Sequence, residues 1–197
     1  MKKIKEIIIG TNNRGKYKEI RDLLPKNIKK YSPRVFKILS PEENGKTFQA
    51  NSAIKASYFS KKTNLICLSD DSGLAIDILN GKPGIYSSRW AGKKNNFNLA
   101  INKIFTEIKK IKKKSKSKIT AKFICCMTLH WPNGKFLSSL GFIKGRISDK
   151  KRGKKGFGYD PIFIPDGYFE TFGEMKPELK MSIDHRYKAF LKIKKFF

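Results

Sequence analysis

Residues 10–16 (GTNNRGK) have the residue types and spacing of a phosphate-binding loop. They follow the apolar run Ile4–Gly10 and precede a segment with helical spacing. The backbone N–H groups and the positive dipole end at the start of a helix bind anions such as phosphate. The spacing also fits the first seven positions of a Walker A loop, but Tyr17 stands where that loop needs a hydroxyl for Mg²⁺. On this segment alone, an ordinary strand-turn-helix junction is the alternative.

Two neighbouring carboxylates, Asp70 and Asp71, follow the apolar run 65–68. In α/β sheets, ligands bind at the carboxyl ends of strands, and paired carboxylates suit Mg²⁺, which prefers oxygen ligands. We therefore expect a turn at residues 69–73 in which both carboxylates converge on a metal. Glu42 and Glu43, on a predicted loop, could complete this site. The alternatives are a surface turn for the aspartates and a solvated loop for the glutamates.

A third candidate site is the glycine-rich segment 153–158, which is followed by Tyr159 and Asp160. It places aromatic rings on a flexible backbone, where a ring can cover a nucleotide base. Its glycine order does not match a dinucleotide-binding fingerprint, and no helical pattern follows it directly. Lys180, His185 and Arg186 offer donors and positive charge near the C-terminus. A solvated lysine-rich face and a structural histidine are the alternatives there.

The elements that must position these residues alternate between strands and helices along the chain. Short apolar or alternating runs predict strands, and apolar residues at three- and four-residue spacing predict helices. An Asn-Gly turn at 133–134 predicts a hairpin. The predicted strands are 4–10, 35–39, 65–68, 74–78, 119–129 and 135–143, and the predicted helices are 17–24, 98–111, 181–196 and one that starts near residue 51. This order favours an α/β fold with a mixed, twisted sheet flanked by helices.

Length and charge limit the class of protein. The 197 residues fit one domain, or two lobes that share a core. The formal charge is +28, but 37 of the 44 basic residues are lysine, which a coding bias would place at any tolerant surface position. No aromatic residue interleaves the lysine-rich tract 109–118, so we expect a solvated linker there and no specific nucleic-acid site.

The cysteines and the N-terminal segment argue against other classes. Cys67, Cys125 and Cys126 form no C-x-x-C pair, which favours reduced core residues over zinc ligands. The apolar run at 7–9 is far too short for a signal peptide or a membrane span. We therefore expect a cytoplasmic protein that does not bind membranes.

Five ordered motifs resemble those of the inosine triphosphate pyrophosphatases, also called XTP/dITP diphosphatases. They lie at residues 11–16 (TNNRGK), 69–74 (SDDSGL), 81–89 (GKPGIYSSR), 156–161 (GFGYDP) and 180–186 (KMSIDHR), and the match covers nearly the whole chain. The resemblance implies a single nucleoside-triphosphate pyrophosphatase domain over residues 1–197, with two lobes around a central substrate cleft. It also implies a homodimer that hydrolyses ITP, dITP and XTP with Mg²⁺, yields the monophosphate and pyrophosphate, and so cleanses the nucleotide pool.

The resemblance further implies a role for each matching residue. Asp71 would serve as the catalytic residue and bind the metal, and Glu42, rather than Glu43, would assist the metal. Phe157 would stack on the base, and Arg186 would accept the keto group of ITP and reject the amino group of ATP. Residues 11–16 and Lys180 would bind phosphates. The full implied substrate-binding set is Thr11, Asn12, Asn13, Arg14, Gly15, Lys16, Ser72, Phe157, Gly158, Tyr159, Asp160, Lys180, His185 and Arg186.

The sequence departs from the family pattern at two places. Residues 48–52 read FQANS where the family commonly has a glutamate before the asparagine, and Lys155 replaces a common glycine.

Two other functions are alternatives to this hypothesis. One is a P-loop kinase or NTPase, which would release orthophosphate and a diphosphate. The other is a nucleic-acid-binding module that uses the +28 charge.

Overall fold

The computed structural model describes residues 4–92, 95–111 and 118–197, whose strands pair into a six-stranded mixed sheet. The strand order is β2-β1-β3-β4-β5-β6. Strand β1 is parallel to β2 and β3, whereas β5 and β6 are antiparallel. The strands are β1 (Glu6–Ile9), β2 (Lys29–Tyr31), β3 (Cys67–Ile76), β4 (Ile119–His130), β5 (Phe136–Ile147) and β6 (Phe163–Pro165). The α/β fold with a mixed sheet is thus confirmed.

Along the chain, the helices lie between the strands or follow the last strand. Each is too short or too polar to span a bilayer, as far as the described residues go. They are α1 (Arg14–Leu23), α2 (Phe48–Thr63), α3 (Ser87–Trp90), α4 (Phe97–Ile111), α5 (Pro177–Ile183) and α6 (His185–Ile193). The predicted helices at 17–24 and 98–111 and the predicted hairpin are therefore confirmed, and the helix expected near residue 51 begins three residues earlier.

The chain divides into two compact units. The first comprises Met1–Asp71, Cys125–Gly141 and His185–Phe197, and the second comprises Ser72–Ile124 and Phe142–Asp184. The long strands β3, β4 and β5 contribute residues to both units. Each unit has its own apolar core.

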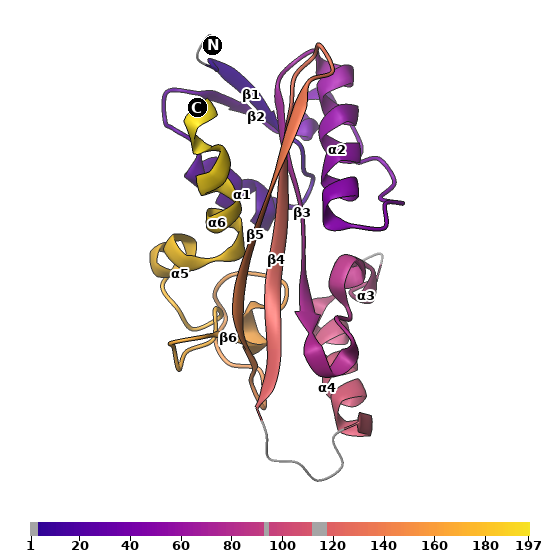
Figure 1. The fold of residues 1–197 in the computed structure, drawn as a ribbon, viewed down its shortest axis with the longest axis vertical. Coiled ribbons are helices and arrows are strands. Elements are labelled where there is room, and N and C mark those ends of the chain that lie inside the picture. The colour runs from indigo at the N-terminus through magenta and orange to yellow at the C-terminus, as the bar shows by residue number, and fades with distance from the viewer. Residues whose placement is uncertain (1–3, 93–94, 112–117) are drawn as a thin grey trace. The chain divides into compact units, whose positions relative to one another are not determined.

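The first unit is a sheet covered on both faces, and strand β1 shows how the sequence encodes this. Successive side chains of a strand point to opposite faces. Ile7 and Ile9 pack in one cluster with residues of α1 and α6, whereas Ile8 packs in another with Ala56 and Phe59 of α2. A continuous apolar strand is typical of such a buried position. Figure 1 shows α1 and α6 together on one side of these strands and α2 on the other.

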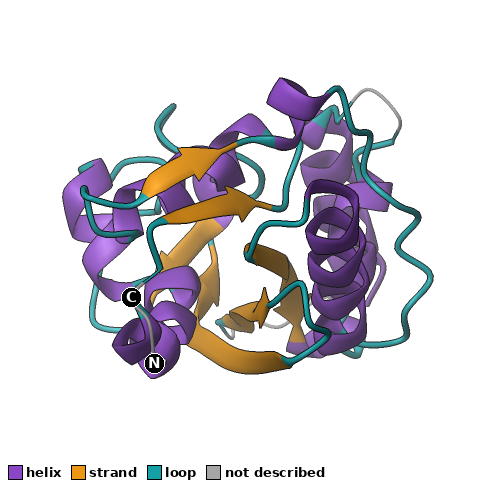
Figure 2. Ribbon diagram, turned by 90° about the horizontal axis from the view of Figure 1, so that it is seen from above, coloured by secondary structure: helices purple, strands orange, loops and turns teal. Residues whose placement is uncertain are grey.

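The second unit packs helix α4 against the remaining strand segments. Ala100, Ile101, Ile104 and Ile108 are buried at the three- and four-residue spacing of one helical face. They share a cluster with apolar residues of β3, β4 and β5. Figure 2 distinguishes the helices, strands and loops of the described residues by colour.

The strand predicted at 35–39 is wrong. Residues Pro33–Phe36 form a 3₁₀ helix, which Pro33 opens and which ends at Lys37 with a positive φ of 55°. The strand of this region is β2, which pairs with β1 so that Lys29 lies opposite Glu6. Because β2 has three residues and an exposed, polar start, it carries no alternating apolar pattern that could reveal it.

Two further predictions of local structure are wrong. Residues 69–73 form no turn, since they continue β3 from Cys67 to Ile76. The single helix predicted at 181–196 is divided at Asp184, whose extended backbone (ψ 171°) ends α5 before α6 begins at His185. The lysine-rich tract predicted to be a linker lies outside the described residues at 112–117.

Candidate active site

The predicted phosphate-binding loop connects β1 to α1 in the first unit. Asn13 caps α1, because its side chain accepts a hydrogen bond from the Lys16 N–H at 3.1 Å, and the Asn13 N–H donates to Thr11 Oγ1 at 3.2 Å. Ser69 Oγ, in the adjacent strand β3, donates to the carbonyl of Gly10 at 2.8 Å. A Cβ on Gly10 would lie 2.7 Å from Cys67 Sγ, so only glycine allows this close approach. The loop therefore has the expected geometry at a helix N-terminus.

The other residues of the loop, Asn12, Arg14 and Gly15, lie around the start of α1. Asn12 donates from its amide to Ser40 Oγ at 3.1 Å and to the carbonyl of Ile38 at 3.3 Å, which ties the loop to the segment before α2. Arg14 is exposed, and Gly15 is half-buried in the first turn of α1. The structure thus brings residues 11–16 together around the start of one helix.

Asp70 lies at the centre of a buried network of charges on the α1 and α6 side of β3. Its Oδ2 is 3.5 Å from Lys16 Nζ and accepts hydrogen bonds from Arg186 Nη2 at 2.9 Å and Nε at 3.3 Å. Arg186 Nη1 also donates to Glu19 of α1. Burial alone would raise the pKa of Asp70, but the charges of Lys16, Arg186 and Lys55 outweigh it and hold the pKa well below its usual value.

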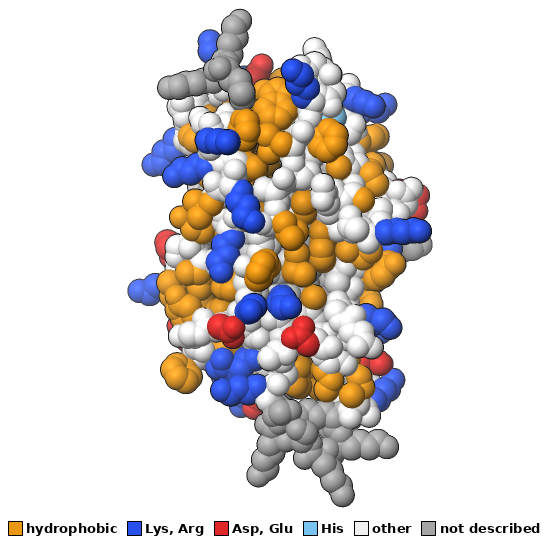
Figure 3. Space-filling view, in the orientation of Figure 1, with side chains coloured by type: hydrophobic (Ala, Val, Ile, Leu, Met, Phe, Trp, Pro, Cys, Tyr) orange, Lys and Arg blue, Asp and Glu red, His pale blue; other side chains and the backbone are white. Residues whose placement is uncertain are grey.

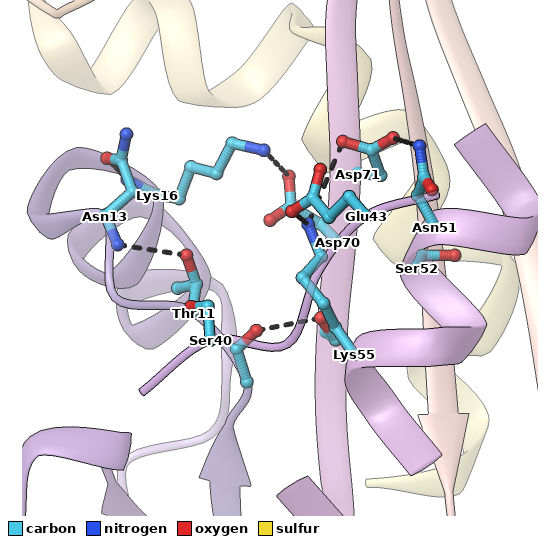
Figure 4. A network of polar contacts seen from close by, with 12 residues as sticks. Thr11, Asn13, Lys16, Ser40, Glu43, Asn51, Ser52, Lys55, Asp70 and Asp71 are labelled. Carbon is cyan, nitrogen blue, oxygen red and sulfur yellow. Dashed lines mark hydrogen bonds and ion pairs between the residues drawn. The ribbon is translucent and has the colours of Figure 1, made fainter. Parts of the chain in front are cut away.

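Asp71 points to the opposite face of β3, toward α2. Asn51 Nδ2 donates to Asp71 Oδ2 at 3.1 Å, and Lys55 Nζ lies 3.8 Å from Asp71 Oδ1. The same ammonium is 2.5 Å from Glu43 Oε1. The expectation that both aspartates converge at a turn is therefore wrong, because neighbouring residues of a strand face opposite sides. Figure 4 shows Lys16 directed toward Asp70, whereas Asn51 and Lys55 are directed toward Asp71.

The electrostatic setting of Asp71 suits a group that must bind a proton or a cation. Burial raises its pKa and Glu43 adds to this, while the charges of Lys16 and Lys55 work in the other direction without cancelling the rise. For Lys55, burial would lower the pKa, but Asp71, Glu43 and Asp70 outweigh it and the pKa is raised. Lys55 is therefore a charged lysine although it is only 4 % exposed.

Of the two loop glutamates, the structure places Glu43 beside Lys55 and near Asp71, while Glu42 is exposed. Sequence reasoning also misses Lys55 and Glu19. Asn51 and Lys55 are four residues apart and thus share one face of α2, which is buried. The four-residue spacing of Asn51 and Lys55 was the signal that the sequence offered, whereas the burial of Lys55 is seen only in the structure.

The residues around Asp71 fit a magnesium ion. The described part of the chain contains no cluster of three or more histidine, cysteine, aspartate or glutamate side chains for a metal. Mg²⁺, however, is commonly bound through one or two carboxylates, and water and substrate phosphates complete its shell. The carboxylates of Asp71 and Glu43, both within reach of one cationic group at Lys55 Nζ, supply such a set.

The glycine-rich loop of the second unit is organised by Asp160. This buried carboxylate accepts hydrogen bonds from Lys180 Nζ at 2.6 Å and from the Phe157 N–H at 2.8 Å. Gly156 has a φ of 72°, and a side chain there would clash with Asp160. Lys180 Nζ also lies 5.1 Å from the centre of the half-buried Phe157 ring. Asp160 thus fixes the loop backbone and the lysine together.

Tyr159, in contrast, belongs to the core of the second unit. It is 2 % exposed, its hydroxyl donates to the carbonyl of Ser87 at 2.9 Å, and its ring meets the ring of Phe97 edge-on. Burial raises the pKa of its hydroxyl. Gly158, with a φ of 68°, faces the same Phe97 ring. These contacts anchor the loop on which Phe157 lies.

His185 and Arg186 open helix α6 and are both buried in the first unit. Helix α6 lies directly on β5, because a side chain at Gly141 would clash with the backbone at His185 and Ala189. Ser139 Oγ donates to the carbonyl of Ala189 at 2.9 Å and fixes this contact. Ser72 is half-buried within β3. The contacts of these three residues with a substrate remain predictions.

Comparison with known proteins shows the family to which the chain belongs. The model of the Ham1 family matches residues 7–196. A dITP/XTP pyrophosphatase of Zymomonas mobilis is 38% identical over 93% of this chain and 88% of that protein, and one of Rhodospirillum centenum is 40% identical over 93% and 90%. The solved structure of a HAM1 protein from Coxiella burnetii superposes with a TM-score of 0.85, at 36% identity and 96% coverage of both chains.

The α/β fold and the matched relatives together place the chain in the class of enzymes that hydrolyse nucleoside triphosphates. The family model matches residues 7–196, and the relatives are 38% and 40% identical over 93% of the chain, which identifies the family. This chain belongs to the Ham1 family.

Proposed function

We propose that this protein hydrolyses non-standard purine nucleoside triphosphates, namely ITP, dITP and XTP, to the monophosphate and pyrophosphate. The observation that carries the proposal is Asp71, a buried strand carboxylate held by Asn51 and Lys55 in the same unit as the phosphate-type loop. The relatives named dITP/XTP pyrophosphatases support the substrate class. The protein would thereby cleanse the nucleotide pool, and we place this activity in the cytoplasm.

The phosphate end of the substrate is assigned to the loop at residues 11–16. Water attacks the α-phosphorus, a new P–O bond forms, and the bond to the bridging oxygen breaks so that pyrophosphate leaves. Asp71 positions this water and takes its proton. Negative charge develops on the phosphoryl oxygens, and the positive dipole end of α1 together with the Lys16 ammonium stabilises it.

Asp71 and Glu43 are the residues that would hold Mg²⁺. When bound, the ion supplies positive charge that offsets the charge developing on the phosphates. The resemblance favours Glu42 in this role, but the contacts favour Glu43, because Glu43 shares the Lys55 ammonium with Asp71.

For the base, we propose contacts with Phe157 and Lys180. Since the ammonium of Lys180 lies beside the Phe157 ring and is held by Asp160, we propose that it donates to the base rather than to a phosphate. A 6-keto purine accepts such a hydrogen bond, whereas the 6-amino group of adenine opposes it. Unsatisfied buried donors make this kind of discrimination strong.

Replacing Phe157 by alanine should weaken substrate binding more than it slows the chemical step. Stacking of a base on an aromatic ring is worth about 1–3 kcal/mol. We therefore expect KM for ITP to rise roughly 5- to 150-fold, with a smaller change in kcat, measured by steady-state kinetics. Phe169→Ala, at a ring that is 86 % exposed in the same unit, is the control and should leave KM unchanged. Equal KM values for the two variants would contradict the stacking role.

We also propose a homodimer. Phe136 and Leu140, on the same face of β5, are 57 % and 47 % exposed, and Figure 3 shows hydrophobic side chains gathered along the β4–β5 hairpin. Because a charge of +28 makes two copies repel each other, a contact between them needs such an apolar surface. Light scattering should give a mass of twice 22.6 kDa, and Leu140→Lys should yield the monomer. A monomeric parent protein would contradict the proposal.

The proposed activity is tested by product analysis. Purified protein is incubated with ITP, XTP, GTP or ATP and Mg²⁺, and both products are identified. We expect inosine or xanthosine monophosphate and pyrophosphate, with little turnover of ATP. Orthophosphate and a diphosphate would indicate a P-loop NTPase instead. Tight binding to nucleic acid at high salt, with no nucleotide hydrolysis, would indicate a nucleic-acid-binding module.

A further inference from the structure

Lys55 holds a position in the first unit that the proposed reaction does not yet explain. Its side chain comes from the middle of α2 and is 4 % exposed. Lysine is almost never fully buried unless it is paired. The ammonium lies 2.5 Å from Glu43 Oε1 and 3.8 Å from Asp71 Oδ1. It therefore stands between two carboxylates that come from a loop and from a strand.

These two carboxylates are the pair assigned to Mg²⁺. Two carboxylates held close together repel each other unless a cation lies between them. The Lys55 ammonium, which contacts both carboxylates, can provide that positive charge (Figure 4). A divalent ion and an ammonium cannot occupy the same place, because their charges repel strongly in a buried site.

We propose that Lys55 is a built-in counter-ion that occupies the metal position and is exchanged for the metal. This inference rests on the proposed function, which assigns a metal ion to Asp71 and Glu43. It adds a role for Lys55, which has no part in the proposed reaction. The ammonium keeps Glu43 and Asp71 in place before the metal arrives. When the metal binds together with a triphosphate, the displaced ammonium exchanges its carboxylate partners for phosphate oxygens.

This exchange couples the binding of metal to the binding of nucleotide. Metal alone must displace the ammonium without offering it a new partner, so its affinity is low. Metal and triphosphate together supply both a cation for the carboxylates and anionic oxygens for Lys55. Lys55 is thus a positioning residue that makes the site assemble only when the charged substrate is present.

The test measures metal binding directly, with Mn²⁺ as the probe in place of Mg²⁺. Mn²⁺ is titrated into the nucleotide-free parent protein and Lys55→Met, and bound ion is followed by electron paramagnetic resonance. We expect Lys55→Met to bind Mn²⁺ about 10- to 100-fold more tightly, because a competing charge has been removed. The variant should also unfold at a lower temperature without metal, and Mn²⁺ should restore most of that loss. Lys62→Met, at an exposed position of the same helix, should behave like the parent.

Unchanged or weaker Mn²⁺ binding by Lys55→Met would overturn the proposal. If Lys55→Met does not fold, Lys55→Arg keeps a bulkier charge at the same place, and we expect it to retain low Mn²⁺ affinity in the absence of nucleotide. Tight Mn²⁺ binding by Lys55→Arg would then contradict the counter-ion role. The proposed function fails separately, if the parent protein does not release pyrophosphate from ITP.

Discussion

Asp71→Asn should lower kcat for ITP hydrolysis by about 10²–10⁴-fold, the usual contribution of a positioned general base. The amide has nearly the same shape as the carboxylate, so it can still accept the hydrogen bond from Asn51. It cannot take a proton from water, and it carries no charge for a metal or for Lys55. The loss should therefore appear mainly in kcat, measured with saturating ITP and Mg²⁺.

The control for this prediction is Asp149→Asn, the same substitution at an exposed position. It should retain the kcat of the parent protein. The unfolding temperature of Asp71→Asn should remain close to that of the parent, because Lys55 keeps Glu43 as a partner and the hydrogen bond to Asn51 is kept. The raised pKa of Asp71 also means that its charge does not favour the folded state. A kcat within threefold of the parent for Asp71→Asn would remove this residue from the reaction.

The phosphate-type loop could be predicted from the sequence because its determinants are local. The cap of α1 involves Asn13 and Lys16, three residues apart, and the apolar run of β1 precedes it directly. The helix at 98–111 was accessible for the same reason, since Ile101, Ile104 and Ile108 define one face. Short-range spacing carries all of this information.

The surroundings of the aspartates could not be predicted, because their partners are remote. Arg186 is 116 residues from Asp70, and Asn51 is 20 residues from Asp71. The polar residues at 69–73 have the composition of a turn, yet they continue strand β3. The strand can hold Asp70 and Asp71 because lysine and arginine side chains from α1, α2 and α6 neutralise their charges. Tertiary pairing here overrides the local preference of Asp, Ser and Gly for turns.

Asp70→Asn should destabilise the protein by about 3–5 kcal/mol, the usual cost of breaking a buried ion pair by removing one partner. Asp70 is fully buried and faces both Lys16 and Arg186, and Arg186 is 1 % exposed. The neutral amide leaves their two charges with less compensation in a chain that already carries +28. Because whole domains are stable by only about 5–15 kcal/mol, urea unfolding should show a clear loss. Asp22→Asn, at an exposed pair with Arg21, is the control and should change stability by less than about 1 kcal/mol.

The pH dependence distinguishes this electrostatic cause from a packing defect. The folded-state pKa of Asp70 is depressed, so its stabilising effect is fully present above the unfolded pKa of about 3.9 and is lost as the pH falls through the folded value. The difference in stability between the parent and Asp70→Asn should therefore be constant near neutral pH and shrink below about pH 4. Adding Arg186→Met to Asp70→Asn removes a buried guanidinium that has lost one of its carboxylate partners, and it should recover part of the loss. A difference that persists unchanged in acid, with no recovery in the double variant, would mean that the amide disturbs packing and that the charge of Asp70 is not what holds α6 and β3 together.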